Sequence, residues 1–188
     1  MSYKELYDFC QGLDIHIGRD TILDKIRELS GQEVRWYMRA MDRTVMRGMF
    51  LKFPPGSTHY IAKFFGPNVV AVARGENRCW QRLIIVKEAL HVLGPDNKAT
   101  STPESFETLL NQIDTPGGQP SPQTLSEYEC LYLALALFCP EEIRLQFQKE
   151  RVEQKLDDLT IATRLRIPQA YVPTLLAPNF KEVIDSII

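Results

Sequence analysis

Lys87, Glu88 and His91 lie close together in the sequence and carry side chains that can hold a cation or move a proton. In the pattern H-E-x-x-H, residues four apart share one face of a helix, so two histidines bind one zinc ion while the glutamate activates a metal-bound water. This chain reads K-E-A-L-H in the same frame. A protonated amine has no lone pair for zinc and repels the ion, so we do not expect tight zinc binding.

The pattern around these residues predicts the elements that position them. Apolar residues at three- and four-residue spacing predict a helix from about Asn77 to Leu93, which Gly94 and the proline after it end. Short segments rich in β-formers precede it, separated by Pro- and Gly-containing turns, and cover residues 49–53, 59–65 and 68–74. These segments predict a small antiparallel three-stranded sheet.

The remaining segments predict a mainly helical chain. Residues 3–10 favour a short helix, and a longer helix begins near residue 20, carries Ile22 and later Trp36 and Tyr37, and is open to a break at Gly31. Further helices are expected at residues 125–138 and from Pro140 to about 156. The sequence therefore predicts one α+β domain over residues 1–188, divided into N-terminal helices (1–48), a core (49–140) with a loop excursion at 95–123 and a weak helical island at 104–113, and C-terminal helices (141–188).

The order of helices, small sheet, E-x-x-H helix, long loop and second glutamate-bearing helix resembles the ImmA/IrrE metallopeptidase family over residues 69–176. The lead-in at residues 78–86 and the stretch 127–140, where glutamates precede small and apolar residues and a final proline, are similar to the family's signatures. The resemblance implies a zincin-like domain with Glu88 at the position of the general base, and His91 and Glu129 at those of the second and third zinc ligands. Lys87 stands where the first ligand belongs.

Three alternatives for the altered position stay open. His16 or His59 could approach in three dimensions and supply a substitute ligand. The ammonium of Lys87 could instead take the vacant cation position and pair with Glu88 and Glu129, because two buried carboxylates without a counter-cation are costly. In the simplest alternative, Lys87 points to solvent and His91 is a hydrogen-bonded core histidine.

The resemblance also implies a function. Members of the family cleave or control regulators, commonly helix-turn-helix repressors linked to phage, mobile elements or stress responses. We therefore expect a degenerate, metallopeptidase-like domain, a pseudopeptidase, that binds a protein partner in regulation and needs no cofactor. An active zinc-dependent peptidase with a substitute ligand and an unrelated interaction protein are the alternatives.

Composition limits the kinds of partner that the chain is expected to bind and the cell compartment in which it is expected to occur. The formal net charge of −2 gives no global basic field for nucleic acid, and residues 157–176, which resemble a helix-turn-helix, are better explained by core packing. A local basic and aromatic cluster at residues 35–39, with Arg43 and Arg47, could contact a partner or form an ordinary helix surface. The first residues do not resemble a signal peptide, and the apolar run 131–139 is too short to cross a bilayer. The four scattered cysteines are expected to be buried as free thiols. These observations together predict a cytoplasmic protein.

Overall fold

The computed structural model describes residues 3–94 and 121–188, which combine helices with a three-stranded sheet. This architecture confirms the predicted α+β class. The elements, in chain order, are α1 (Tyr3–Gln11), α2 (Arg19–Ser30), β1 (Arg35–Arg39), β2 (Gly48–Lys52), α3 (Tyr60–Phe65), β3 (Asn68–Ala73), α4 (Arg78–Ala89), the 3-10 turn η1 (Leu90–Val92), α6 (Pro122–Phe138), α7 (Glu141–Val152), α8 (Asp158–Leu165), the 3-10 turn η3 (Gln169–Tyr171), α9 (Val172–Leu175) and α10 (Phe180–Ile187).

The sheet has the order β1-β3-β2, with the fully buried strand β3 in the middle. Strand β3 pairs antiparallel with β2 and parallel with β1. The predicted strand count is confirmed, whereas the purely antiparallel arrangement is wrong. The reason is that β3 inserts between two strands of opposite direction and must run parallel to one of them.

Two segments differ from the sequence prediction. Residues 35–39, predicted as helix, form strand β1, because Gly31 ends α2 in the left-handed conformation (φ 68°) and the aromatic residues that follow pair with β3. Residues 59–65, predicted as a strand, form the short helix α3. Its first turn is capped by Nδ1 of His59, which accepts from the amide of Ile61, and Gly66 ends it.

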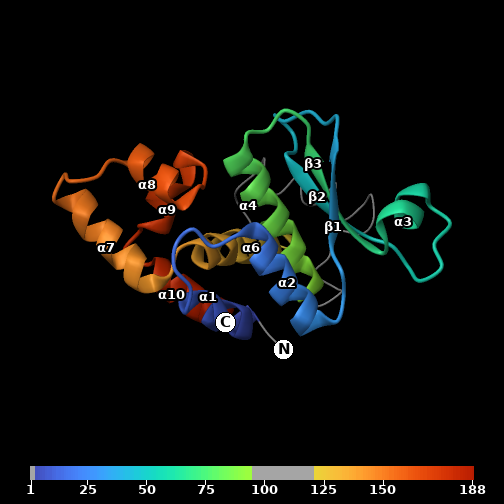
Figure 1. Cartoon of the computed structure of the whole chain (residues 1–188), viewed down its shortest axis with the longest axis horizontal. Helices are drawn as coiled ribbons and strands as arrows, with labels where there is room; N and C mark the ends of the chain where they lie inside the picture. The colour runs from blue at the N-terminus through green and yellow to red at the C-terminus, as the bar shows by residue number, and fades with distance from the viewer. Residues whose placement is uncertain (1–2, 95–120) are drawn as a thin grey trace.

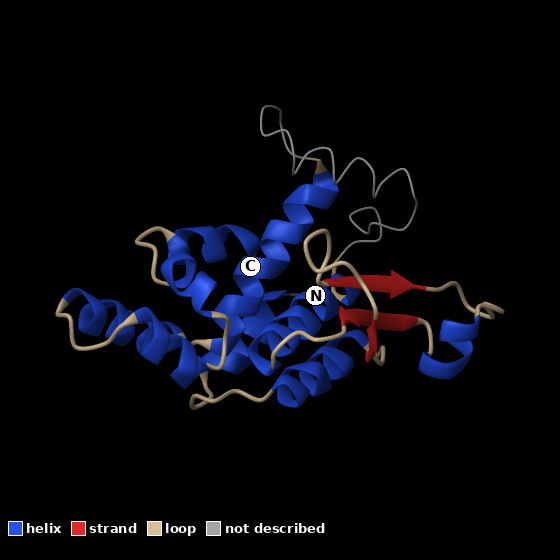
Figure 2. Ribbon diagram, turned by 90° about the horizontal axis from the view of Figure 1, so that it is seen from above, coloured by secondary structure: helices blue, strands red, loops and turns tan. Residues whose placement is uncertain are grey.

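Helices α2, α4 and α6 lie between the sheet at one end of the molecule and α7 to α9 at the other (Figures 1 and 2). The helix predicted from Asn77 is confirmed as α4, with Asn77 as its N-cap. Helix α6 begins at Pro122, three residues earlier than predicted. The helical island expected at residues 104–113, and the excursion as far as residue 120, lie outside the described residues.

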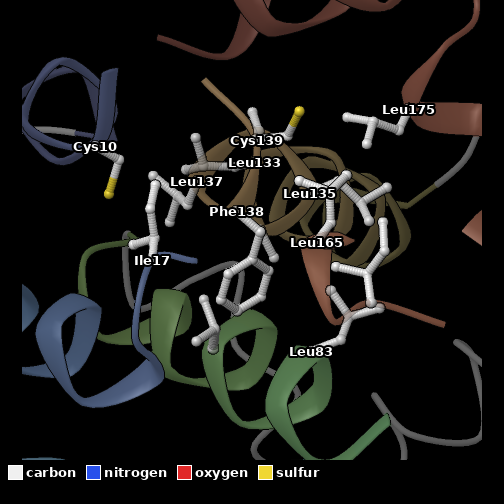
Figure 3. Close-up of a cluster of buried hydrophobic side chains, with 14 of the residues drawn as sticks. Cys10, Ile17, Leu83, Leu133, Leu135, Leu137, Phe138, Cys139, Leu165 and Leu175 are labelled. Carbon is white, nitrogen blue, oxygen red and sulfur yellow. The ribbon is translucent and has the colours of Figure 1, made fainter. Parts of the chain in front are cut away.

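One apolar core joins α1, α4 and α6 to the C-terminal helices. Helix α6 supplies much of it, and Phe138 lies between this helix and α4 (Figure 3). The helix-turn-helix-like segment packs on the same core through the buried Ile161, Leu165 and Val172, as its core-packing interpretation predicted. Cys10, Cys130 and Cys139 are buried, and Cys79 is half-buried. Among the described residues, no helix combines the length and apolar character needed to cross a membrane.

Gly48 sets how closely strand β2 approaches α4. A Cβ at this position would overlap Cγ2 of Ile84 and lie 3.2 Å from the carbonyl oxygen of Ala71. We therefore expect Gly48→Ala to lower the free energy of unfolding by about 1 to 3 kcal/mol through overpacking. Urea denaturation measures the change. Gly12→Ala is the matched control, because its added Cβ would meet only one atom at 3.7 Å, and equal losses in both variants would contradict the role of Gly48.

Candidate cation site

Two helices bring the acidic, basic and imidazole side chains together. Lys87 and Glu88 lie in the last turn of α4, and His91 lies in the 3-10 turn that continues it. Glu127 comes from α6, whose start is fixed by Ser121 Oγ accepting from the Thr124 amide at 3.2 Å. Because α4 and α6 pack on each other, side chains remote in sequence meet at their contact.

The ammonium of Lys87 bridges two carboxylates. Its Nζ donates to Oε1 of Glu88 at 2.8 Å and to Oε2 of Glu127. Nε2 of His91 lies 3.2 Å from Oε1 of Glu127 and 3.8 Å from Oε2 of Glu88, although its N–H direction is not aligned for a hydrogen bond with any described residue. We call these four residues the Lys87 cluster. It holds two carboxylates and two groups that can each carry a positive charge.

The cluster uses Glu127 where the sequence resemblance assigned Glu129. Two residues along a helix turn the side chain by about 200°, so only one of the two glutamates can face α4. Glu127 shares its face with the buried Cys130 and Ala134, three and seven residues later. Glu129 instead lies near the phenol of Tyr3, whose pKa it helps to raise after burial and Cys130. No local sequence pattern distinguishes the two glutamates, because the rotation of α6 about its axis is set by the packing of its buried face.

Burial and mutual charge set the ionisation of the cluster. Burial disfavours the charged form of Lys87, but Glu88 and Glu127 more than compensate and raise its pKa. Burial likewise opposes protonation of His91, yet Cys130, Glu127 and Glu88 raise its pKa to about 10. Burial would raise the pKa of Glu127, but His91 and Lys87 lower it to about 2. At neutral pH the two cations therefore balance the two carboxylates.

The imidazole of His91 is enclosed on its other sides. Nδ1 lies 3.9 Å from the sulfur of Cys130, which in turn lies 3.8 Å from the hydroxyl of Tyr3. Phe50 of strand β2 stacks on the ring with centroids 6.0 Å apart. Only 7% of the His91 side chain is exposed. The sheet, α1 and α6 thus hold the ring in one orientation.

The donor set does not fit zinc while Lys87 is in this position. Glu88, His91 and Glu127 each offer a ligand atom, and these atoms all lie within 4.8 Å of one another. Carboxylates and imidazole are suitable zinc ligands. However, the ammonium hydrogen-bonds to both carboxylates, and a protonated imidazole has no lone pair for a metal. A metal would have to displace Lys87 and take the proton from His91.

The candidate substitute ligands lie elsewhere. His59 caps α3 and stacks between Phe53 and Tyr60, and His16 is exposed in the loop before α2. Neither belongs to the group of potential metal ligands found among the described residues. The predicted pairing of Lys87 was with Glu88 and Glu129; the structure shows the pairing with Glu88, and the second carboxylate is Glu127 instead of Glu129. The alternative in which Lys87 points to solvent does not agree with the structure.

Comparisons with models of known protein families, with curated proteins and with solved structures found no match for this chain. The arrangement of the site therefore has to be interpreted from its own chemistry.

Replacing Lys87 tests its role as the internal counter-cation. We expect Lys87→Met to lower the free energy of unfolding at pH 7 by about 3 kcal/mol, because two carboxylates would remain at a largely buried site with one cation. Chemical denaturation measures this loss. In the control Lys4→Met, which breaks the exposed ion pair with Asp8, the loss should stay below about 0.5 kcal/mol. A Lys87→Met variant as stable as the control would show that the pairing contributes nothing.

The lowered pKa of Glu127 predicts acid sensitivity. Its folded value of about 2 lies below the ordinary value of 4.5, so the ionised carboxylate stabilises the fold above pH 4.5, and this stabilisation disappears as the pH falls towards 2. We expect roughly 1 to 3 kcal/mol of the free energy of unfolding to be lost over this range. Urea denaturation at several pH values should give a shallower dependence for Glu127→Gln than for the natural chain. Glu28→Gln, at an exposed ion pair, should keep the natural dependence, and identical curves for all three would contradict the assignment.

Proposed function

We propose that this chain is a degenerate metallopeptidase-like domain that acts by binding a protein partner in regulation, without hydrolysing it. The observation that carries the proposal is the pairing of Lys87 with Glu88 and Glu127, carboxylates supplied by two different helices. The ammonium stands in the place that a metal ion would need between these side chains. The negative charges of the two carboxylates are therefore already balanced by basic side chains of the same chain.

Glu88 is poorly suited to hydrolysis in this arrangement. A general base must reach the proton of an attacking water, and in a zinc peptidase the metal also activates that water. Here Oε1 of Glu88 accepts a hydrogen bond from Lys87, and only 6% of the Glu88 side chain is exposed. The group that the resemblance assigns as the base is therefore occupied by an internal partner. This supports a binding role over a catalytic one.

The proposed partner is a protein of the class that the resemblance implies, a helix-turn-helix regulator of phage, mobile elements or stress responses. A direct role on nucleic acid is not proposed. The net charge of −2 provides no broad basic field, and the apolar residues of α8 and α9 are used for core packing. The chain would then act on the regulator through contact alone.

A second candidate function rests on a specific feature of the site. Glu88, His91 and Glu127 hold three ligand atoms within 4.8 Å of one another, and carboxylate and imidazole are both ligand types that zinc sites use. An active zinc peptidase would follow if Lys87 left the cluster and the metal took its place. Glu127 would then be the substitute ligand in addition to His91.

Zinc titration of the natural chain and of Lys87→His separates these functions. We expect the natural chain to take up little zinc, because the ion must displace a hydrogen-bonded ammonium. Lys87→His should bind about one equivalent, because it supplies a second imidazole four residues before His91. Isothermal titration calorimetry and metal analysis of the dialysed proteins measure uptake. The double variant Lys87→His/His91→Ala is the control and should lose the gained site.

Each outcome of the titration decides between candidates. A full equivalent on the natural chain, together with chelator-sensitive cleavage of a casein substrate, would replace the proposal by the second candidate. Failure of both the natural chain and Lys87→His to bind zinc would remove the support for a peptidase-like site. The chain would then be an interaction protein unrelated to that family.

A further inference from the structure

The segment between β2 and β3, residues 53–67, extends from the end of the sheet as an arm that carries α3. Figures 1 and 2 show α3 beyond the sheet, on the side away from the other helices. Ile61 of α3 is buried, and Phe65 stacks on Tyr37 of β1 with ring centroids 5.1 Å apart. These two residues are four apart and explain how one face of α3 is held to the sheet.

The neighbouring face of α3, about 100° around the helix axis, presents two aromatic rings to solvent. Tyr60 is 63% exposed and Phe64 is 75% exposed, more than any other aromatic side chain among the exposed large hydrophobic residues of the described chain. They are also four residues apart and therefore lie side by side, with the exposed Lys63 next to them. Packing within the chain buries Ile61 and holds Phe65 against the sheet, but it leaves most of the surface of Tyr60 and Phe64 exposed.

The arm is ordered by its own contacts. The ring of His59 stacks against Phe53 at 5.0 Å and against Tyr60 at 4.9 Å, and its Nδ1 accepts from the Ile61 amide at 3.2 Å. The consecutive prolines Pro54 and Pro55 further restrict the backbone. Side chains that are held in place before binding lose less conformational entropy when they meet a partner.

Charge is distributed unevenly around the arm. Residues 53–67 contain no aspartate or glutamate and one basic residue, the exposed Lys63, in a chain of net charge −2. The arm therefore carries a formal charge of +1 and the rest of the chain −3. An acidic group of a partner would be attracted to Lys63 and would meet no carboxylate within the arm.

We propose that the arm formed by residues 53–67 is a docking surface for an acidic segment of a partner protein. Tyr60 and Phe64 contact apolar side chains of that segment, and Lys63 pairs with one of its carboxylates. The inference goes beyond the proposed function, since it assigns the contact surface, and it rests on that function only in expecting a protein partner.

The size and chemistry of the surface favour a protein over nucleic acid or a membrane. A phosphate backbone or an anionic bilayer is held by several cations acting together. Helix α3 offers one ammonium beside two large rings over six residues. Two ordered aromatic side chains with a charged neighbour match the compact clusters that dominate protein interfaces, where tyrosine is enriched.

Selection of peptides on the full chain tests the proposal. We would select a displayed library of random dodecapeptides on the immobilised chain and measure the affinity of the selected peptides by fluorescence polarisation. The expected peptides are enriched in aspartate and glutamate next to apolar residues. Tyr60→Ser/Phe64→Ser should weaken their binding by about 10-fold or more, and Lys63→Glu should weaken it as well.

Matched variants keep the test specific. Leu145→Ser and Val152→Ser change side chains of α7 that are 50% and 79% exposed, and Lys181→Glu reverses a charge on α10, so all three should retain binding. Circular dichroism and thermal unfolding verify that each variant is folded. Lys87→His should also bind the peptides normally, so a failed zinc titration and a failed docking test remain distinguishable.

Several outcomes would overturn the inference. The library could yield no binders, the binders could lack acidic residues, or the Tyr60/Phe64 variant could bind as tightly as the natural chain. Binding of an oligothymidylate, or of phosphatidylcholine vesicles containing phosphatidylserine, that depends on Tyr60 and Phe64 would replace the protein segment by nucleic acid or by a membrane surface.

Discussion

The contact between α4 and α6 depends on one buried ion-pair cluster. Removing Glu88 and Glu127 from water would cost several kcal/mol if they had no counter-cation. Lys87 offsets that cost by hydrogen-bonding to both, and the protonated His91 completes a neutral group. The apolar residues of the two helices can pack together because the polar ones at the end of α4 are paired. The core and the site are thus parts of the same interface between helices.

Local pattern predicted the helix that carries the site, but it could not select the partner residue on α6. Helix α4 has a side-chain cap at Asn77 and a regular apolar pattern, and both are properties of neighbouring residues. Glu127 and Glu129 both lie far from α4 in the sequence. Which of them faces Lys87 depends on the rotation of α6 about its axis. That rotation is set by Cys130, Leu133 and the rest of the buried face, so it is fixed by packing.

The sheet shows a similar limit. The strands at residues 48–52 and 68–73 were predicted as 49–53 and 68–74, within one residue at each end, because β-formers and turn residues mark both. Residues 35–39 and 59–65 were misassigned, since both are short and rich in aromatic residues that suit either a helix or a strand. Their structure is decided by contacts: pairing with β3 makes the first a strand, and the cap from His59 makes the second a helix. The parallel pairing of β1 depends on strand order, which no local pattern encodes.

The Lys87 cluster and the arm each contain a lysine, but only the lysine of the cluster has its charge balanced by described residues of the chain. Lys87 lies among carboxylates of its own chain, where its charge is already balanced, so the cluster has little attraction left for an external ligand. Lys63 lies in a segment without acidic residues, next to rings that the fold leaves exposed. A partner gains more free energy where charge and apolar surface are still unmatched. The exposed rings and Lys63 therefore suit the arm to binding, and the paired charges suit the cluster to a structural role, so recognition of a protein through the arm would not require Glu88 or His91.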